Sequence, residues 1–147
     1  MRKLFDQFVF FIEIIVALDA NDYFKRGVCV REPLTEKLWR EEKYRVMFHS
    51  QKHYNQIRQA MRDQLSHDHI KQLIDAAIQQ TPTEGSMRNA CQHMWGYFRK
   101  VASSEEKQKY EQLLNTCDIP ALLYFLQQLA IQYQVPYLQA STILQRK

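Results

Sequence analysis

The segment that decides the fold reads RNACQHMWGYFRK and spans residues 88–100. Placed on a helix at about 100° per residue, its apolar and polar side chains fall on different sides. The apolar side, with Cys91 at its edge, carries Met87, Ala90, Met94, Tyr97, Phe98 and Val101. This spacing predicts a helix over 86–101 that begins at Ser86 and packs one face against the core.

Two polar stripes cover the rest of the same helix. One consists of Arg88, Gln92, Trp95 and Arg99, and the other of Asn89, His93, Gly96 and Lys100. A glycine inside a helix costs about 1 kcal/mol relative to alanine, so Gly96 indicates a close approach by another helix or by a ligand. Cations, amides and an aromatic ring without an acid suit phosphate contacts and base stacking. A solvated face and simple helix packing are the alternatives.

Signals for helix starts and ends recur along the chain. They predict further helices over residues 3–19, 35–65, 66–78, 103–116, 118–134 and 137–144. Only 3 glycines and 4 prolines are present, too few for the many tight turns of an all-β protein. We therefore predict an all-α fold, a single compact helical domain of six or seven helices that includes one long helix, the one over residues 35–65.

The N-terminal part differs from the rest. Residues 8–18 are apolar except for Glu13 and follow two cations, so they superficially resemble a signal peptide. Charged residues interrupt the run, and it is shorter than the roughly 20 apolar residues of a spanning helix. We interpret residues 1–34 as an N-terminal extension or a docked helix, and residues 35–147 as the helical domain.

Cysteine usage bears on the compartment. Cys29, Cys91 and Cys117 are odd in number and form no C-x-x-C pair. Such a set argues against a disulfide framework, a zinc knuckle or an iron–sulfur site built by this chain alone. We expect a cytoplasmic protein with no membrane partner and no cofactor.

The positive charge is concentrated in two segments. The whole chain has a net charge of +4, yet residues 37–62 hold seven cations and only two acids, and residues 86–101 hold three cations and no acid. The remainder is therefore net acidic. A basic face of this kind suits nucleic acid, although a solvated helix face is the commoner meaning of a charge run.

Three histidines raise the question of chemistry. His49 and His53 are four residues apart and His93 lies on another helix, so the three rings would have to converge to bind zinc. No H-E-x-x-H glutamate lies between the first two, and no acid is close to His93 in the sequence. Cys91 sits at an apolar edge where a thiol is usually inert. We predict no metal site and no catalytic residues.

A set of motifs resembles the YbgA-like domain of unknown function over about residues 36–145. The matching residues are His49, Ser50, Gln51, Tyr54, Asn89, His93, Gly96, Tyr97 and Phe98. That domain occurs alone or fused behind an iron–sulfur desulfidase that removes sulfur from thiolated uridine, and in the enzymes that act on tRNA it is thought to hold the tRNA. The cluster-binding cysteines are absent here, so the resemblance implies an RNA-holding role only. Tyr97 and Phe98 fall on the core face, which indicates packing.

These observations lead to three hypotheses. The first is a non-catalytic module that binds structured RNA such as tRNA through basic helix faces, together with a desulfidase or another nucleic-acid enzyme. The second is a protein-interaction subunit that docks a separately encoded enzyme, and the third a small histidine-dependent metal enzyme. For the first hypothesis, with Trp95 available for stacking, the contact residues are Arg40, Lys43, Gln51, Arg58, Arg62, Arg88, Asn89, His93, Trp95, Arg99 and Lys100.

Overall fold

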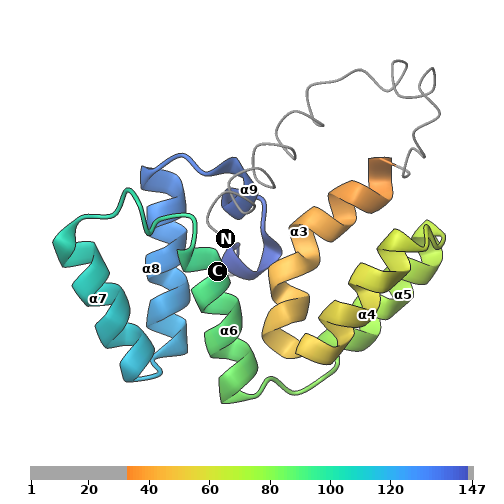
Figure 1. Cartoon of the computed structure of the whole chain (residues 1–147), viewed down its shortest axis with the longest axis horizontal. Helices are drawn as coiled ribbons and strands as arrows, with labels where there is room; N and C mark the ends of the chain where they lie inside the picture. The colour runs from red at the N-terminus through yellow and green to blue at the C-terminus, as the bar shows by residue number, and fades with distance from the viewer. Residues whose placement is uncertain (1–32, 146–147) are drawn as a thin grey trace. The chain divides into compact units, whose positions relative to one another are not determined.

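The structure, a computed structural model, describes residues 33–145 of the chain (Figure 1). Its helices are α3 (Pro33–His49), α4 (Gln51–Arg62), α5 (His67–Ile78), α6 (Glu84–Trp95), α7 (Ser104–Asn115), α8 (Ile119–Gln132), α9 (Pro136–Gln139) and the 3-10 turn η1 (Thr142–Leu144). No strand occurs within this range, which confirms the all-α fold and the single compact helical domain. The prediction for residues 1–34 lies outside the described residues, except for Pro33 and Leu34, which open α3.

Helix α6 lies at the centre of this domain. Helix α3 packs on one side of it and α8 on the other, while α4 and α5 pair with each other beside α3 and α7 packs on α8 (Figure 1). The core between them contains fully buried Met47, Ile57, Met94, Phe98 and Leu126. Burial of each such side chain stabilises the fold by about 1.5–3 kcal/mol, so this apolar contact fixes where the polar faces of α3, α4 and α6 lie.

Several helix starts agree with the sequence signals. Ser66 caps α5, Ser103 and Glu106 form the capping box of α7, and Asp118 caps α8. The start of α6 is different, because Thr83 rather than Ser86 is its cap. The Thr83 hydroxyl accepts from the Ser86 amide at 3.1 Å, and the Ser86 hydroxyl accepts from the Thr83 amide at 2.9 Å. Ser86 therefore serves as the third residue of a capping box, where glutamate or glutamine is usual.

The predicted long helix over 35–65 is two helices. The chain breaks at Ser50, whose backbone is extended (φ −161°, ψ 115°) and whose hydroxyl accepts from the His53 amide at 3.3 Å. The Phe48 carbonyl at the end of α3 accepts instead from the Ser86 hydroxyl at 2.8 Å. A side-chain cap and a contact from α6 thus replace helical hydrogen bonds lost at the break. The apolar spacing continues across Ser50, which is why periodicity did not reveal it.

The start of the predicted long helix also differs from the prediction. Helix α3 begins at Pro33, so Thr35 is inside the helix and is not its cap. The Thr35 side chain is buried, and its hydroxyl lies 3.0 Å from Nδ1 of His67 at the start of α5. Thr35 therefore joins two helices.

The end of α6 corrects two further expectations. The α-helix stops at Trp95, and residues 96–101 continue as turns, so Val101 is 55% exposed and lies outside the core. A Cβ atom added at Gly96 would lie 3.1 Å from the His93 carbonyl oxygen, and no other described atom beyond its chain neighbours would be within 4 Å. Gly96 therefore relieves crowding within its own turn, and the expected approach of another helix is wrong.

Candidate functional site

A polar cleft lies where α3 and α4 meet, facing the α5–α6 loop and the first turns of α6. Its volume is about 560 Å³. The residues that line it are His49, Ser50, Gln51, Gln80, Thr81, Thr83, Gly85, Ser86, Asn89 and His93. None of these ten residues is acidic, and five of them belong to the motif set recognised in the sequence. The fold therefore brings two distant halves of that motif set into one site.

An amide chain joins the two walls of the cleft. Nδ2 of Asn89 on α6 donates to Oε1 of Gln51 on α4 at 2.8 Å, and Nε2 of Gln51 donates to Oδ1 of Asn55 at 3.1 Å. Asn89 therefore uses one N–H group in this chain, whereas Gln51 uses its carbonyl oxygen and one N–H group. The second N–H groups of Asn89 and Gln51 and the Asn89 carbonyl oxygen remain for a ligand.

His49 is held in one ring orientation. Its Nδ1 atom lies 2.7 Å from the Gln80 carbonyl oxygen. Because a carbonyl oxygen can only accept, Nδ1 carries a proton, and in the neutral ring Nε2 is an acceptor. The α5–α6 loop thereby fixes which nitrogen of His49 is available to a ligand.

The three histidines do not form a metal site. His49 and His93 line the cleft, whereas Nδ1 of His53 lies 2.8 Å from the Ser50 hydroxyl and His53 is not part of the lining. Across residues 33–145, no group of three histidine, cysteine or acidic side chains is placed to hold a metal ion. The three-histidine zinc hypothesis is therefore wrong for the described domain.

The electrostatics of His93 keep its ring neutral near pH 7. Partial burial lowers the pKa of His93 from its ordinary value, and the positive charge of Lys43 lowers the pKa further. A neutral imidazole offers one donor and one acceptor. His93 can therefore contact an uncharged polar ligand without adding charge to the cleft.

The lowered pKa of His93 predicts a pH-dependent contribution to stability. Its folded-state pKa lies below the unfolded value, so the unfolded chain binds more protons below about pH 6.5. The contribution is complete above that pH and is lost as the pH falls through the folded-state pKa. We expect the wild type to lose unfolding free energy relative to His93→Gln between about pH 7.5 and 5, measured by urea denaturation. A difference that stays constant over that range would contradict this account.

Two cations lie beside the cleft on aromatic rings. Nζ of Lys43 is 5.3 Å from the centre of the Tyr44 ring and 5.9 Å from that of Tyr137, and the Arg58 guanidinium carbon is 5.7 Å from that of Tyr54. Burial lowers the pKa of Lys43, and the charge of Arg58 lowers the pKa further. These like charges are close enough to repel each other, and an anion bound between them would relieve that repulsion.

The predicted basic face divides into paired and unpaired cations. Lys37 lies 3.9 Å from Glu41, and Arg45 lies 3.5 Å from Glu42. Among the described residues, no acid pairs with Lys43, Arg58 or Arg62. Arg40 is half-buried on α3, and its Nε atom has no hydrogen-bond partner there. Lys43 and Arg58 are therefore the cations near the cleft that no described acid neutralises.

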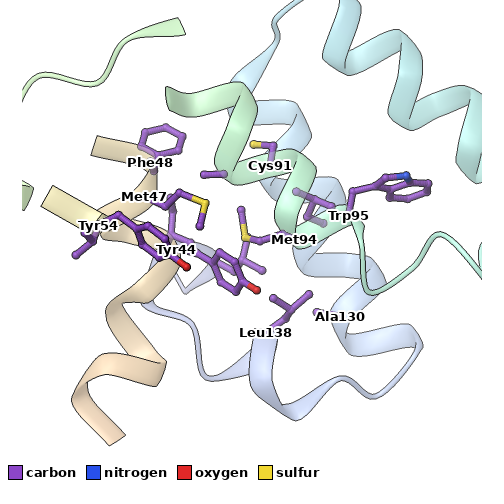
Figure 2. Packing of buried hydrophobic residues seen from close by; sticks show 14 of the residues in the cluster. Tyr44, Met47, Phe48, Tyr54, Cys91, Met94, Trp95, Ala130 and Leu138 are labelled. Atoms are coloured by element: carbon purple, nitrogen blue, oxygen red, sulfur yellow. The ribbon is translucent and has the colours of Figure 1, made fainter. Parts of the chain in front are cut away.

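The other polar stripe of α6 faces α7. Trp95 is only 7% exposed and stacks on Tyr110, with ring centres 4.1 Å apart and planes 7° apart. Figure 2 shows the Trp95 ring directed away from Tyr44 and Tyr54. The expectation that Trp95 is free to stack on a base is therefore wrong.

Arg88 on the same stripe has a structural partner. One of its terminal nitrogens donates to the Leu114 carbonyl oxygen at 2.7 Å, close to the end of α7, and its Nε atom lies 3.7 Å from Glu84. Arg99 and Lys100 are exposed after α6 ends. Arg88 and Arg99 both lie near Tyr110 of α7. The RNA contacts predicted for Arg88, Arg99 and Lys100 remain predictions.

The remaining motif residues pack. Phe98 is fully buried, Tyr54 is buried against the Trp39 ring, and Tyr97 stacks on Tyr137 with ring centres 6.0 Å apart. The prediction that Tyr97 and Phe98 serve packing is confirmed. Cys91 is also buried, and burial with the nearby Cys117 raises its pKa to about 12, so its thiol is unreactive at neutral pH.

The sequence did not indicate that the α5–α6 loop forms one wall of the cleft. Gln80, Thr81 and Thr83 line it because the loop folds back onto the end of α3. The Thr-Pro-Thr-Glu-Gly stretch indicated a loop, but nothing in it indicated which helix the loop contacts. The break at Ser50 was missed as well, and the only signal for it was the serine itself, a residue type that often caps helices.

Replacement of Ser50 is expected to destabilise the α3–α4 junction. Ser50→Ala removes the side-chain cap of α4, which typically costs about 0.5–2 kcal/mol of unfolding free energy. Ser50→Asp retains an acceptor at the cap and is expected to recover most of that loss. Urea denaturation measures both variants, and Ser104→Ala, an exposed serine that follows the cap of α7, is the matched control. Equal stability of Ser50→Ala and Ser104→Ala would contradict the assigned cap.

Fold and cleft together define a small all-α domain whose recognised motif residues, Gly96 excepted, lie in a polar site or pack in the apolar interior. The chain belongs to the family described as "Protein of unknown function (DUF1722)", which it matches over residues 43–146. That range contains the whole cleft. Comparisons with curated proteins and with solved structures gave no match. No helix among residues 33–145 has the length and apolar character to cross a membrane.

Proposed function

We propose that this domain binds structured RNA, of which tRNA is the leading candidate, without catalysing a reaction itself. The observation that carries the proposal is the position of Lys43 on α3 and Arg58 on α4, which have no acidic partner among the described residues. The two cations lie near each other, and Lys43 lies near His93 of the polar cleft. Phosphate contacts supply most of the affinity of such a surface, whereas base contacts supply its selectivity.

The proposed contact surface is smaller than the sequence alone suggested. It consists of the exposed parts of α3, α4 and α6 around the cleft. Phosphates would meet Arg40, Lys43, Arg58 and Arg62, and the polar contacts would come from Gln51, Asn89 and His93. Trp39 is partly buried against Tyr54, the ring that Arg58 covers, and it takes the place first given to Trp95.

The resemblance to the YbgA-like domain suggests which RNA and which partner enzyme the domain would bind. The motif residues that resemble it are those that line the cleft and pack beneath it, which supports placing this chain among such domains. By that likeness, the RNA would be a tRNA presented to a desulfidase-type enzyme in the cytoplasm. The cluster-binding cysteines of such an enzyme are missing from this chain, so any sulfur chemistry would belong to a partner.

Filter binding of unmodified tRNA over a salt series tests the proposal. We expect the logarithm of the affinity to fall linearly with the logarithm of salt concentration between about 50 and 200 mM, with a slope of roughly −0.9 per phosphate contact. Because three or four cations are assigned to phosphates, a slope between about −2.5 and −4 is expected. An affinity that does not change with salt would contradict the proposal.

The alternative function is a protein-interaction subunit. The observation that favours it is on α8, where Tyr124 and Ile131 are 65% and 56% exposed and lie on one face because they are seven residues apart. A pull-down with a desulfidase-type enzyme, using the wild type and a Tyr124→Ser/Ile131→Ser double variant, tests this alternative. Capture of the enzyme by the wild type and not by the variant would favour it, and equal capture by both would exclude this face.

A further inference from the structure

The cleft offers hydrogen-bonding groups that the fold itself leaves unused. Within the described residues, no partner is present for Nε2 of His49, which accepts when the ring is neutral, or for the Asn89 carbonyl oxygen, which is an acceptor. Gln51 has one further N–H donor at the same wall. By contrast, the hydroxyls of Thr83 and Ser86 are engaged in the capping box of α6. The cleft therefore presents acceptors and a donor close together on fixed side chains.

The charge distribution restricts what these groups can bind. The ten lining residues include no acid, lysine or arginine, and His93 is neutral near pH 7. A free anion would find no lysine or arginine in the lining, and a cation would find no carboxylate. Burying either charge without a partner is costly. An uncharged group with donors and acceptors on one edge matches the lining.

The cations near the cleft indicate which chemical groups flank the uncharged group in the ligand. His93 lines the cleft and is also close enough to Lys43 for the charge of the lysine to lower its pKa. Arg58 is in turn close enough to Lys43 to repel it. A ligand with a neutral head in the cleft would therefore carry its negative charge beside the cleft, which is the layout of a nucleotide.

We propose that the cleft holds one unstacked nucleobase of the bound RNA. Asn89 and Gln51 contact the edge of the base, and His49 accepts a hydrogen bond from it through Nε2. The phosphates that flank this nucleotide contact Lys43 and Arg58. This inference rests on the proposed RNA-binding function, and it adds a specific site that recognises a single base outside a duplex.

The test uses five RNA hairpins that differ only at one bulged position. Four of them carry each of the four bases there, and the fifth carries an abasic ribose, so all five have the same phosphates. Anisotropy measures their affinity for the whole chain at fixed salt. We expect the best of the four bases to bind about tenfold more tightly than the abasic hairpin, since two net hydrogen bonds are worth about that factor.

Substitutions in the protein separate the contribution of the base to affinity from that of the phosphates. Asn89→Ala is expected to reduce the preference for a base over the abasic ribose, because only Gln51 and His49 then contact the base. Arg58→Ala is expected to weaken binding of all five hairpins by the same factor. Asn55→Ala is the matched control, because Asn55 ends the amide chain outside the cleft, and it is expected to retain the preference for the base.

Each outcome decides between the two proposals. Salt-dependent binding with no preference for any base over the abasic ribose would overturn the base site and leave the RNA-binding function standing. A base preference that is undiminished in Asn89→Ala would overturn the assignment of the site to this cleft. Absence of salt-dependent binding to all five hairpins and to tRNA would overturn the proposed function together with the site.

Discussion

Trp95→Ala is expected to lower the free energy of unfolding by about 3–5 kcal/mol, the usual cost of truncating a buried aromatic side chain. Trp95 is 7% exposed, stacks on Tyr110 and lies 6.2 Å from the Phe98 ring, so its removal leaves a cavity between α6 and α7. The loss is a large part of the stability of a domain of this size. Urea denaturation of the wild type and the variant measures it.

Trp95→Phe separates packing from RNA contact. Phenylalanine retains a ring on Tyr110, so we expect a folded protein with the tRNA affinity of the wild type. The substitution also leaves Trp39 as the only tryptophan, since the chain has 2, and its fluorescence then reports on binding near Tyr54. A Trp95→Phe variant that keeps its stability but binds tRNA at least tenfold more weakly would restore the stacking role for Trp95.

Arg58→Ala/Arg62→Ala is expected to reduce tRNA affinity at least about tenfold, because each arginine can form a charge-assisted bond to a phosphate. Both side chains are exposed on α4, one helical turn apart. Losing two phosphate contacts is expected to make the salt slope shallower by about two. Stability is expected to change little, because exposed side chains seldom contribute much. Filter binding over a salt series measures both quantities.

Arg99→Ala/Lys107→Ala is the matched control for that variant. It removes the same amount of charge, but Arg99 follows α6 and Lys107 is exposed on α7, the side towards which Trp95 points. We expect its tRNA affinity to fall far less, through the change in net charge alone. Equal losses in the two double variants would show that binding depends on net charge and not on the face of α4.

The core side of α6 was predictable because its apolar spacing is regular. Met94 and Phe98 are buried as the helical period requires. The period gives an angle around the helix, but it does not say how many neighbours surround that helix. Helix α7 packs beside α6 as well, so Trp95 on an apparently polar stripe became part of the core. Burial on two sides of one helix results from tertiary packing, which the local spacing of apolar residues does not indicate.

The candidate site was predictable in part for the same reason. Gln51, Asn89 and His93 were expected to act together, and they line one cleft. The shape of that cleft depends on the Ser50 break and on the loop carrying Gln80 and Thr81, which contacts the end of α3. Such contacts between residues far apart in the chain follow from packing, and no spacing within either segment indicates them.

Hydrogen–deuterium exchange of the whole chain with and without tRNA locates the RNA contact surface without any substitution. We expect slower exchange on tRNA binding in peptides covering residues 49–62 and 80–93, which form the cleft and its basic border. We expect no change over Ser104–Asn115 in α7. Protection confined to α7, or no protection under conditions where tRNA binds, would contradict RNA binding at the cleft.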